Sequence, residues 1–223
     1  MTNLGEPEES PALRSASERL CLNLSRGLHA AAQPLAILRA SLGASQTDRL
    51  SLFELRELAA NSAAEVERVC TLFSALQQLV SIESVEPHLS PTPIAPLLAH
   101  VADGVELLFK AGGMTLSAEL PETCPPAVID GARTQQALSS VLVVAHGVSR
   151  APDRVELTAT SCSGSVQVVV RNPNSLVDAL SAEAQLGMAI AEASIRSQKG
   201  SFSWSPRPFN VQIQLLTAPM AHP

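Results

Sequence analysis

The chain has 223 residues, enough for one large or two modest domains, with a formal net charge of −6 and only 3% aromatic residues. These features argue against a nucleic-acid-binding surface, which needs basic residues for phosphates and aromatic rings for base stacking. No apolar run approaches the roughly 18–20 residues of a membrane span. We therefore expect a cytoplasmic protein that binds neither membrane nor nucleic acid.

The four cysteines are widely spaced and show no C-x-x-C pattern: Cys21, Cys70, Cys124 and Cys162. This spacing favours isolated thiols over a disulfide framework or a zinc site. We expect the four side chains to be buried and reduced, and we expect no metal centre.

Residues 1–15 are rich in Pro, Glu and Ser without hydrophobic periodicity, so we expect a disordered tail. A helix is predicted from Ala16–Leu42, with Gly43 as its stop. Its apolar residues alternate spacings of four and three, which is typical of a seam between helices: Leu24, Leu28, Ala31, Leu35, Leu38 and Leu42. His29 lies on the rim of this seam. Pro34 lies inside the helix, where a proline costs about 3 kcal/mol.

A second helix is predicted to begin at a capping box formed by Ser51 and Glu54. Its seam runs over four heptads without a break: Leu52, Leu55, Ala59, Ser62, Val66, Val69, Phe73, Leu76 and Val80. Two such helices joined by a short link form an antiparallel hairpin, here over residues 16–82. Because one hairpin leaves its seam half exposed, we expect two copies to form a four-helix bundle, and hence a homodimer.

Prolines at 87, 91 and 93 mark residues 83–93 as a linker, followed by a second domain over 94–217 and a tail over 218–223. In chain order we predict a helix from Ile94 to Gly112, a strand Met114–Glu119, a helix that Asp130 caps and that runs to about Val148, strands Arg154–Ser161 and Val166–Arg171, a helix Ala182–Ser197, and strands Phe202–Ser205 and Asn210–Leu216. This order predicts an α+β fold, an α/β sandwich with helices on one face of a mostly antiparallel sheet.

The segment from His29 to Leu35, HAAAQPL, resembles the phosphoacceptor box of two-component sensor histidine kinases. In that box a histidine is followed after five residues by Pro-Leu. The hairpin, the proline-marked linker and the α+β second domain also occur in the family's order, so the resemblance covers about residues 16–216. It implies a dimerisation and phosphoacceptor hairpin followed by a histidine-kinase-type ATPase domain.

The second domain carries two further segments of the resemblance. Asp130-x-x-Arg133-x-x-Gln136 is similar to the start of the family's ATP-site helix. Leu186–Ile190, continuing to Gly200, is similar to its late glycine box and the helix that follows.

At the positions that the resemblance assigns to nucleotide binding, this sequence departs from the family. The two asparagines that hold Mg²⁺ and phosphates fall on Ser140 and Val144, and an aliphatic side chain cannot ligate Mg²⁺. The adenine-reading Asp-x-Gly pattern falls on Asn172-Pro173-Asn174. Of the glycine boxes only Gly187 remains, and the lid shrinks to about ten residues, SLVDALSAEA. The resemblance therefore implies a degenerate nucleotide site with no ATP chemistry and no bound cofactor.

The position after His29 also departs, because Ala30 stands where the family's kinases carry an acid. ATP-dependent autophosphorylation is therefore disfavoured. A neutral imidazole is still a nucleophile at cytoplasmic pH, so His29 can accept a phosphoryl group from the aspartate of a receiver domain. Arg26 and Gln33, one turn on either side, are candidates for supporting roles, and Pro34 is a candidate for opening a docking groove.

The sequence is thus interpreted as a histidine phosphotransferase of a phosphorelay, a dimer that moves phosphoryl groups between response-regulator receiver domains through His29. Two other functions stay open. One is a non-catalytic pseudokinase that binds a receiver domain or a kinase without taking phosphate. The other is a divergent ATP-dependent histidine kinase, which a nucleotide titration would reveal.

Overall fold

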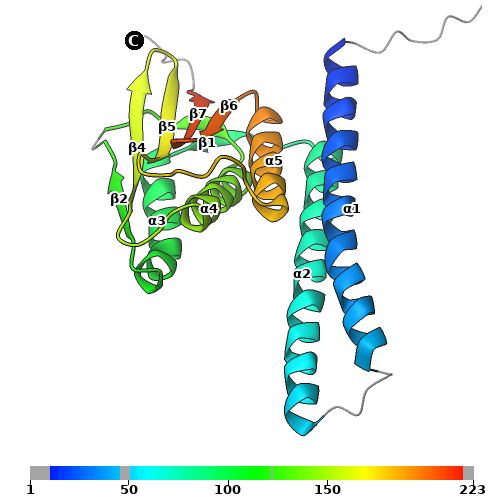
Figure 1. The fold of residues 1–223 in the computed structure, drawn as a ribbon. Coiled ribbons are helices and arrows are strands. Elements are labelled where there is room, and N and C mark those ends of the chain that lie inside the picture. The colour runs from blue at the N-terminus through cyan, green and yellow to red at the C-terminus, as the bar shows by residue number, and fades with distance from the viewer. Residues whose placement is uncertain (1–10, 46–50, 122, 218–223) are drawn as a thin grey trace, which may run out of the picture. The chain divides into compact units, whose positions relative to one another are not determined.

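The fold is that of a computed structural model, which describes residues 11–45, 51–121 and 123–217. The chain forms two compact units that divide between Leu76 and Gln77, and Figure 1 labels their elements except β3. Residues 218–223, predicted as a tail, lie outside the described part. Within the described residues, no helix combines the length and apolar character needed to cross a membrane.

Two long helices, α1 (Pro11–Ser45) and α2 (Leu52–Ser84), run antiparallel as predicted (Figure 1). They make up the first unit, except for the last turns of α2 from Gln77, which belong to the second. Residues 1–10 of the predicted tail lie outside the described residues, whereas Pro11–Ser15 belong to α1. The helix also continues through Gly43 to Ser45. Extending an existing helix by a turn avoids the cost of nucleation, so such ends are poorly marked in a sequence.

The capping box at the start of α2 is confirmed. The Ser51 amide donates to Glu54 Oε2 at 2.7 Å, and the Glu54 amide donates to Ser51 Oγ at 3.3 Å. The hydrogen bonds from Ser51, the backbone one first, hold the pKa of the Glu54 carboxyl below its ordinary value. Two amides of the first turn, which have no partner inside the helix, are satisfied in this way.

Close approach of α1 to α2 depends on Gly27. A Cβ built on Gly27 would overlap Leu76 Cδ2, and both residues are buried. Only hydrogen occupies that side of Gly27, so the two helices meet more closely here than side chains would otherwise allow. This contact lies two residues before His29.

The predicted heptad seams are only partly covered: Ala31 and Leu76 are buried, and Leu24, Leu38, Ser62 and Val69 are partly buried. The exposed members include Leu52, Leu55 and Ala59, and six that recur every seven residues within their helices: Leu28, Leu35, Leu42, Val66, Phe73 and Val80. The buried line of α2 instead includes Leu72 and Leu79, which lie outside the predicted seam. A helix that packs on one neighbour buries one flank of its apolar stripe, whereas a heptad seam faces the centre of a bundle. The single hairpin therefore leaves an apolar face uncovered.

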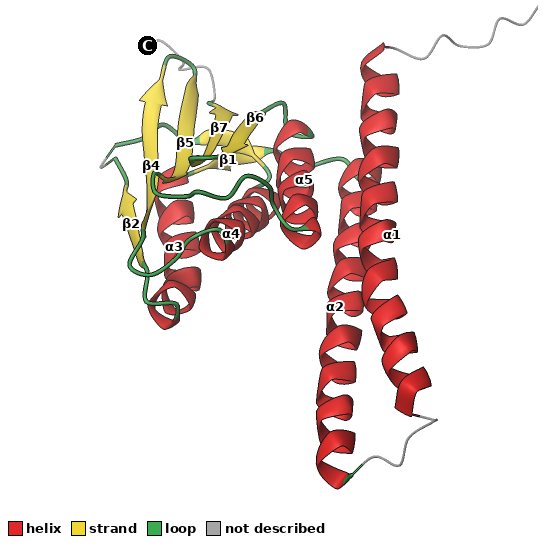
Figure 2. Ribbon diagram, in the orientation of Figure 1, coloured by secondary structure: helices red, strands yellow, loops and turns green. Residues whose placement is uncertain are grey.

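The second unit is an α+β sandwich, which confirms the predicted fold class. Its main sheet has the strand order β2 (Thr115–Glu119), β4 (Arg154–Cys162), β5 (Ser165–Asn172), β7 (Phe209–Leu216) and β6 (Ser201–Pro206). β2 pairs with β4 in parallel and the other pairs are antiparallel. Three helices pack on one face: α3 (Ile94–Ala111), α4 (Gly131–Gly147) and α5 (Ala182–Arg196) (Figure 2).

Strict alternation in the strands explains this one-sided packing. In β7 Val211, Ile213 and Leu215 are buried, while the intervening Gln212 and Gln214 are exposed. Successive side chains of a strand point to opposite faces. One face of the sheet is therefore apolar and covered by helices, and the other is polar and open.

Two short strands were missed by the sequence prediction. β1 (Ser90–Thr92) pairs antiparallel with β3 (Ala127–Ile129) and forms a separate small sheet. β1 lies inside residues 83–93, which were expected to form a linker, and these residues belong to the second compact unit. A segment of three residues is too short to show a period.

The expectation that all four cysteines are buried is wrong. Cys21, Cys70 and Cys162 are exposed and only Cys124 is partly buried, although all four are free thiols as predicted. The burial of Cys124 raises the pKa of its thiol. Cysteine is small and weakly polar, so it fits exposed helix and strand-end positions as well as core positions, and its type alone did not locate it.

Gly200, which follows α5, is enclosed by backbone. A Cβ built there would lie 2.9 Å from the Gln214 carbonyl oxygen and 3.0 Å from that of Ile195. We expect Gly200→Ala to lower the free energy of unfolding by about 2–3 kcal/mol, because backbone atoms must move to admit the methyl group. Urea denaturation measures this. Gly104→Ala is the control: no atom lies within 4 Å of its Cβ, so the better helix former should stabilise α3 by up to about 1 kcal/mol.

Candidate functional site

His29 lies in the middle of α1 with its imidazole exposed. Arg26 and Gln33 are also exposed, and their spacing of three and four residues from His29 places all three on one face of the helix. Pro34 is buried instead. The structure therefore brings together Arg26, His29 and Gln33, and places Pro34 on the opposite, packed side of α1.

Ala30, which follows His29, is buried with 6% of its surface exposed, and Ala31 is buried as well. The helix is thus held along one face by small side chains while His29 remains on the other. A carboxylate at position 30 would be desolvated at a cost that an alanine does not incur. This environment is consistent with the absence of an acid next to the histidine.

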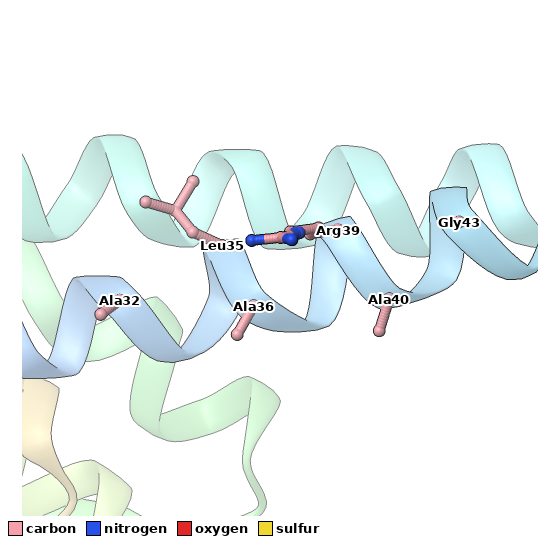
Figure 3. A pocket seen from close by; sticks show the side chains of 6 residues that line it. All are labelled: Ala32, Leu35, Ala36, Arg39, Ala40 and Gly43. Atoms are coloured by element: carbon pink, nitrogen blue, oxygen red, sulfur yellow. The ribbon is translucent and has the colours of Figure 1, made fainter.

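An open groove of about 540 Å³ follows His29 along α1 (Figure 3). Ala32, Ala36 and Ala40 point to one side of the helix in this view, and Leu35 and Arg39 lie on the other side. Gly43 completes the lining. The groove is shallow because the side chains at successive turns are methyl groups, and Arg39 gives it one positive charge.

In the second unit, Val144 and Gly187 come together. Val144 in α4 is buried, and a Cβ built on Gly187 in α5 would lie 3.5 Å from Val144 Cγ2. That distance is an ordinary van der Waals contact, so an isopropyl group fills the space between the two helices at this level. Ser140, one turn earlier on α4, is partly buried.

Asn172 at the end of β5 is fully buried, and its amide is used within the protein. Its Nδ2 donates to Ser149 Oγ at 2.6 Å and to Asp153 Oδ2 at 3.0 Å, while its Oδ1 accepts from the Asn174 amide at 2.9 Å. Both donors of the side chain are therefore engaged. The side chain of Asn174 is exposed. Asn172 holds together the segment after α4 and the turn after β5.

The loop between β5 and α5, which contains the expected lid remnant, is anchored at both ends. Ser175 is buried and its Oγ donates to the Pro206 carbonyl oxygen at 3.2 Å. Leu180 is buried, and its carbonyl oxygen accepts from Gln185 Nε2 at 2.9 Å. Ser181 then caps α5 through the Ala184 amide at 3.2 Å. Few residues are left between these anchors.

Asp153 gives this region a pH dependence. The backbone hydrogen bond from Arg150 and then the side-chain hydrogen bond from Asn172 hold the pKa of its carboxyl below its ordinary value. Because the folded pKa is the lower one, the stabilisation is present at neutral pH and is lost as the pH falls below about 4.

Asp153→Asn should remove this contribution. The thermal midpoint of the variant should lie below that of the wild type at pH 7. The difference should shrink as the pH falls through 4, because protonation of Asp153 then removes from the wild type the same carboxylate acceptor that the substitution removes from the variant. Asp103→Asn, at an exposed position of α3, is the control. A difference that is constant with pH would contradict the assignment.

No protein-family model matches the chain, and no curated protein matches its sequence significantly. Solved structures do match. A histidine kinase of Acinetobacter baumannii, AdeS, superposes with a TM-score of 0.63 at 16% identity, over 83% of this chain and 96% of AdeS. The chain has the histidine kinase fold.

Two further structures support the same fold. A histidine kinase from Burkholderia phymatum superposes with a TM-score of 0.53 at 16% identity, over 95% of this chain and all of that chain. Full-length ShkA, whose structure holds AMPPNP, superposes with a TM-score of 0.58 at 18% identity. The match covers 93% of this chain but 46% of ShkA, so the chain spans about half of that protein.

The sequence did not reveal one feature of the site region, the buried contacts of Arg133 and Gln198. The Asp130-x-x-Arg133 spacing was noted as part of the resemblance. Its structural role was missed, because the partners are backbone groups of distant segments.

Proposed function

We propose that this protein is a histidine phosphotransferase that relays phosphoryl groups between receiver domains of a two-component system through His29. The observation that carries the proposal is the burial of Val144 against Gly187. By the resemblance, Val144 occupies the position of a ligand for Mg²⁺ and phosphate, and its side chain offers no oxygen donor. The exposed imidazole of His29, on the hairpin helix of a histidine kinase fold, is left as the reacting group.

The chemistry requires little from this chain. An unprotonated ring nitrogen of His29 attacks the phosphorus of an aspartyl phosphate, the nitrogen–phosphorus bond forms, and the carboxylate of the first receiver leaves. The imidazole proton is released to solvent. The aspartate of a second receiver then attacks the phosphohistidine, the nitrogen–phosphorus bond breaks as the new oxygen–phosphorus bond forms, and the imidazole takes a proton back from solvent. Receiver domains supply the Mg²⁺ that neutralises the phosphoryl oxygens.

Arg26 and Gln33 fit supporting roles in this step, because both are exposed on the same helix face as His29. The Arg26 guanidinium would offset the charge of the phosphohistidine, and the Gln33 amide would hydrogen-bond to a phosphoryl oxygen. The groove that follows His29 offers a docking surface for a receiver.

A homodimer forms part of the proposal. The exposed apolar residues of α1 and α2 repeat every seven residues on the uncovered face of the hairpin, and a second hairpin is the simplest surface that covers them.

The test uses a panel of purified receiver domains phosphorylated on aspartate. The full chain should take the label as an acid-labile, alkali-stable phosphate, with an equal loss from at least one receiver. Binding of a receiver with no label transfer would favour the interaction module instead. Labelling of His29 by [γ-³²P]ATP with Mg²⁺ would overturn the proposal in favour of a divergent kinase.

A further inference from the structure

Arg133, in the first turn of α4, is surrounded by the main chain at the end of α2. Its Nη2 donates to the Val85 carbonyl oxygen at 2.8 Å and to that of Glu86 at 3.5 Å, and its Nη1 donates to that of Ile82 at 3.3 Å. The last carbonyl groups of a helix have no partners within the helix. The guanidinium supplies a partner to one of these groups, the Ile82 carbonyl, and to two carbonyl groups just after the helix, and its positive charge is favourable at a helix C-terminus.

Asp130 completes the surroundings of Arg133. Each of the two side chains is only 16% exposed, and Arg133 Nε lies 3.6 Å from Asp130 Oδ2. The same carboxylate accepts from the Arg133 amide at 3.1 Å, which caps α4, and from the His88 amide at 3.0 Å. A charge that is mostly removed from water is stable only with such partners.

Gln198, just after α5, joins the same network from the other side. It is 3% exposed, and its Oε1 accepts from the Asp130 amide at 2.6 Å and from Thr134 Oγ1 at 3.3 Å. Its Nε2 donates to the Ser194 carbonyl oxygen at 2.7 Å. The end of α2, the start of α4 and the end of α5 therefore meet in one set of hydrogen bonds.

We propose that Arg133 is a positioning residue that locks residues 82–88 onto the start of α4. Residues 82–88 together with Arg133 and Asp130 are called the joint below. Residues 82–88 should detach from the start of α4 when the guanidinium or the Asp130 carboxylate is lost. The last turns of α2 belong to the same compact unit as α4, so this joint is internal to that unit. The inference does not depend on phosphoryl transfer.

The test is hydrogen exchange of the full chain with Arg133→Ala. The amides of Val85 and His88, which donate to the Ser81 carbonyl oxygen and to Asp130 Oδ2, should exchange about tenfold faster or more than in the wild type, because opening of this segment then no longer costs the hydrogen bonds to Arg133. Amides of β4 and β5 should be unchanged. Arg154→Ala is the matched control, since Arg154 pairs with Glu119 at 3.8 Å on an exposed edge, and it should leave residues 83–89 unchanged.

Unchanged exchange over residues 83–89 in Arg133→Ala would overturn the proposal, and so would a uniform increase across the whole second unit. If Arg133→Ala does not fold, Asp130→Asn keeps an oxygen to cap α4 but removes the second carboxylate oxygen. The His88 amide should then lose its protection about tenfold, while the Thr134 amide, which donates to the Asp130 backbone at 3.0 Å, keeps its own. If the His88 amide keeps its wild-type protection in that variant, the proposal is again overturned.

Discussion

A His29→Ala chain is expected to take no label from any phosphorylated receiver, a loss of at least about a thousandfold in the rate of transfer. A methyl group has no lone pair to attack phosphorus, and water cannot occupy a fixed position on the helix in its place. The expected loss is complete rather than partial, because the step breaks and forms bonds at this one side chain. Rapid-quench transfer from the labelled receiver measures it.

The fold of the variant should be unchanged. His29 is exposed, and substitutions at exposed positions usually change stability by no more than about 0.5 kcal/mol. Far-ultraviolet circular dichroism and the thermal midpoint check this. His100→Ala, at an exposed position of α3, is the matched control and should transfer at the wild-type rate. Wild-type labelling of the His29→Ala chain would place the phosphate elsewhere.

Local signals in the sequence located the starts of α2 and α4 correctly. The Ser51–Glu54 box and the Asp130 cap both form the predicted hydrogen bonds, because capping chemistry involves residues only three positions apart. The strand predicted over Val166–Arg171 likewise lies within β5. Such signals depend on neighbours in the chain, and they could be predicted.

Features that depend on contacts with distant backbone groups could not be predicted. β1 and β3 are three residues each, and their pairing joins segments on either side of α3 and β2. The partners of Arg133 are carbonyl groups, which carry no residue identity. No sequence pattern marks a carbonyl group as the acceptor of a distant guanidinium, so the joint at the end of α2 became visible only in the fold.

The positions that the resemblance assigns to nucleotide binding lie between these two cases. The resemblance located Val144, Gly187 and Asn172 by their order along the chain. The contact of Val144 with Gly187 depends on how α4 and α5 pack, and spacing alone does not specify that. No sequence pattern indicated that Asn172 donates hydrogen bonds to Ser149 and Asp153, because those bonds depend on the conformation of two loops.

Phe73→Glu is expected to dissociate the proposed homodimer. Phe73 is 45% exposed in the single chain and lies seven residues from Val66 and Val80, which are 50% and 41% exposed. Covering a phenylalanine contributes about 1.5–3 kcal/mol, and a carboxylate in its place must be desolvated without a partner. Each dimer carries the change twice. The dissociation constant should therefore rise at least about a thousandfold, which sedimentation equilibrium measures.

The matched control is Val143→Glu, which introduces the same charge at a 50% exposed valine of α4, outside the hairpin. It should leave the wild-type association unchanged. If Phe73→Glu remains a dimer, the uncovered heptad residues do not form the interface. Because Phe73 is already half exposed in one chain, the variant should keep its helix content as a monomer. Its His29 would remain exposed on α1, so transfer by this monomer would show that the reaction needs the helix face around His29 rather than the four-helix bundle.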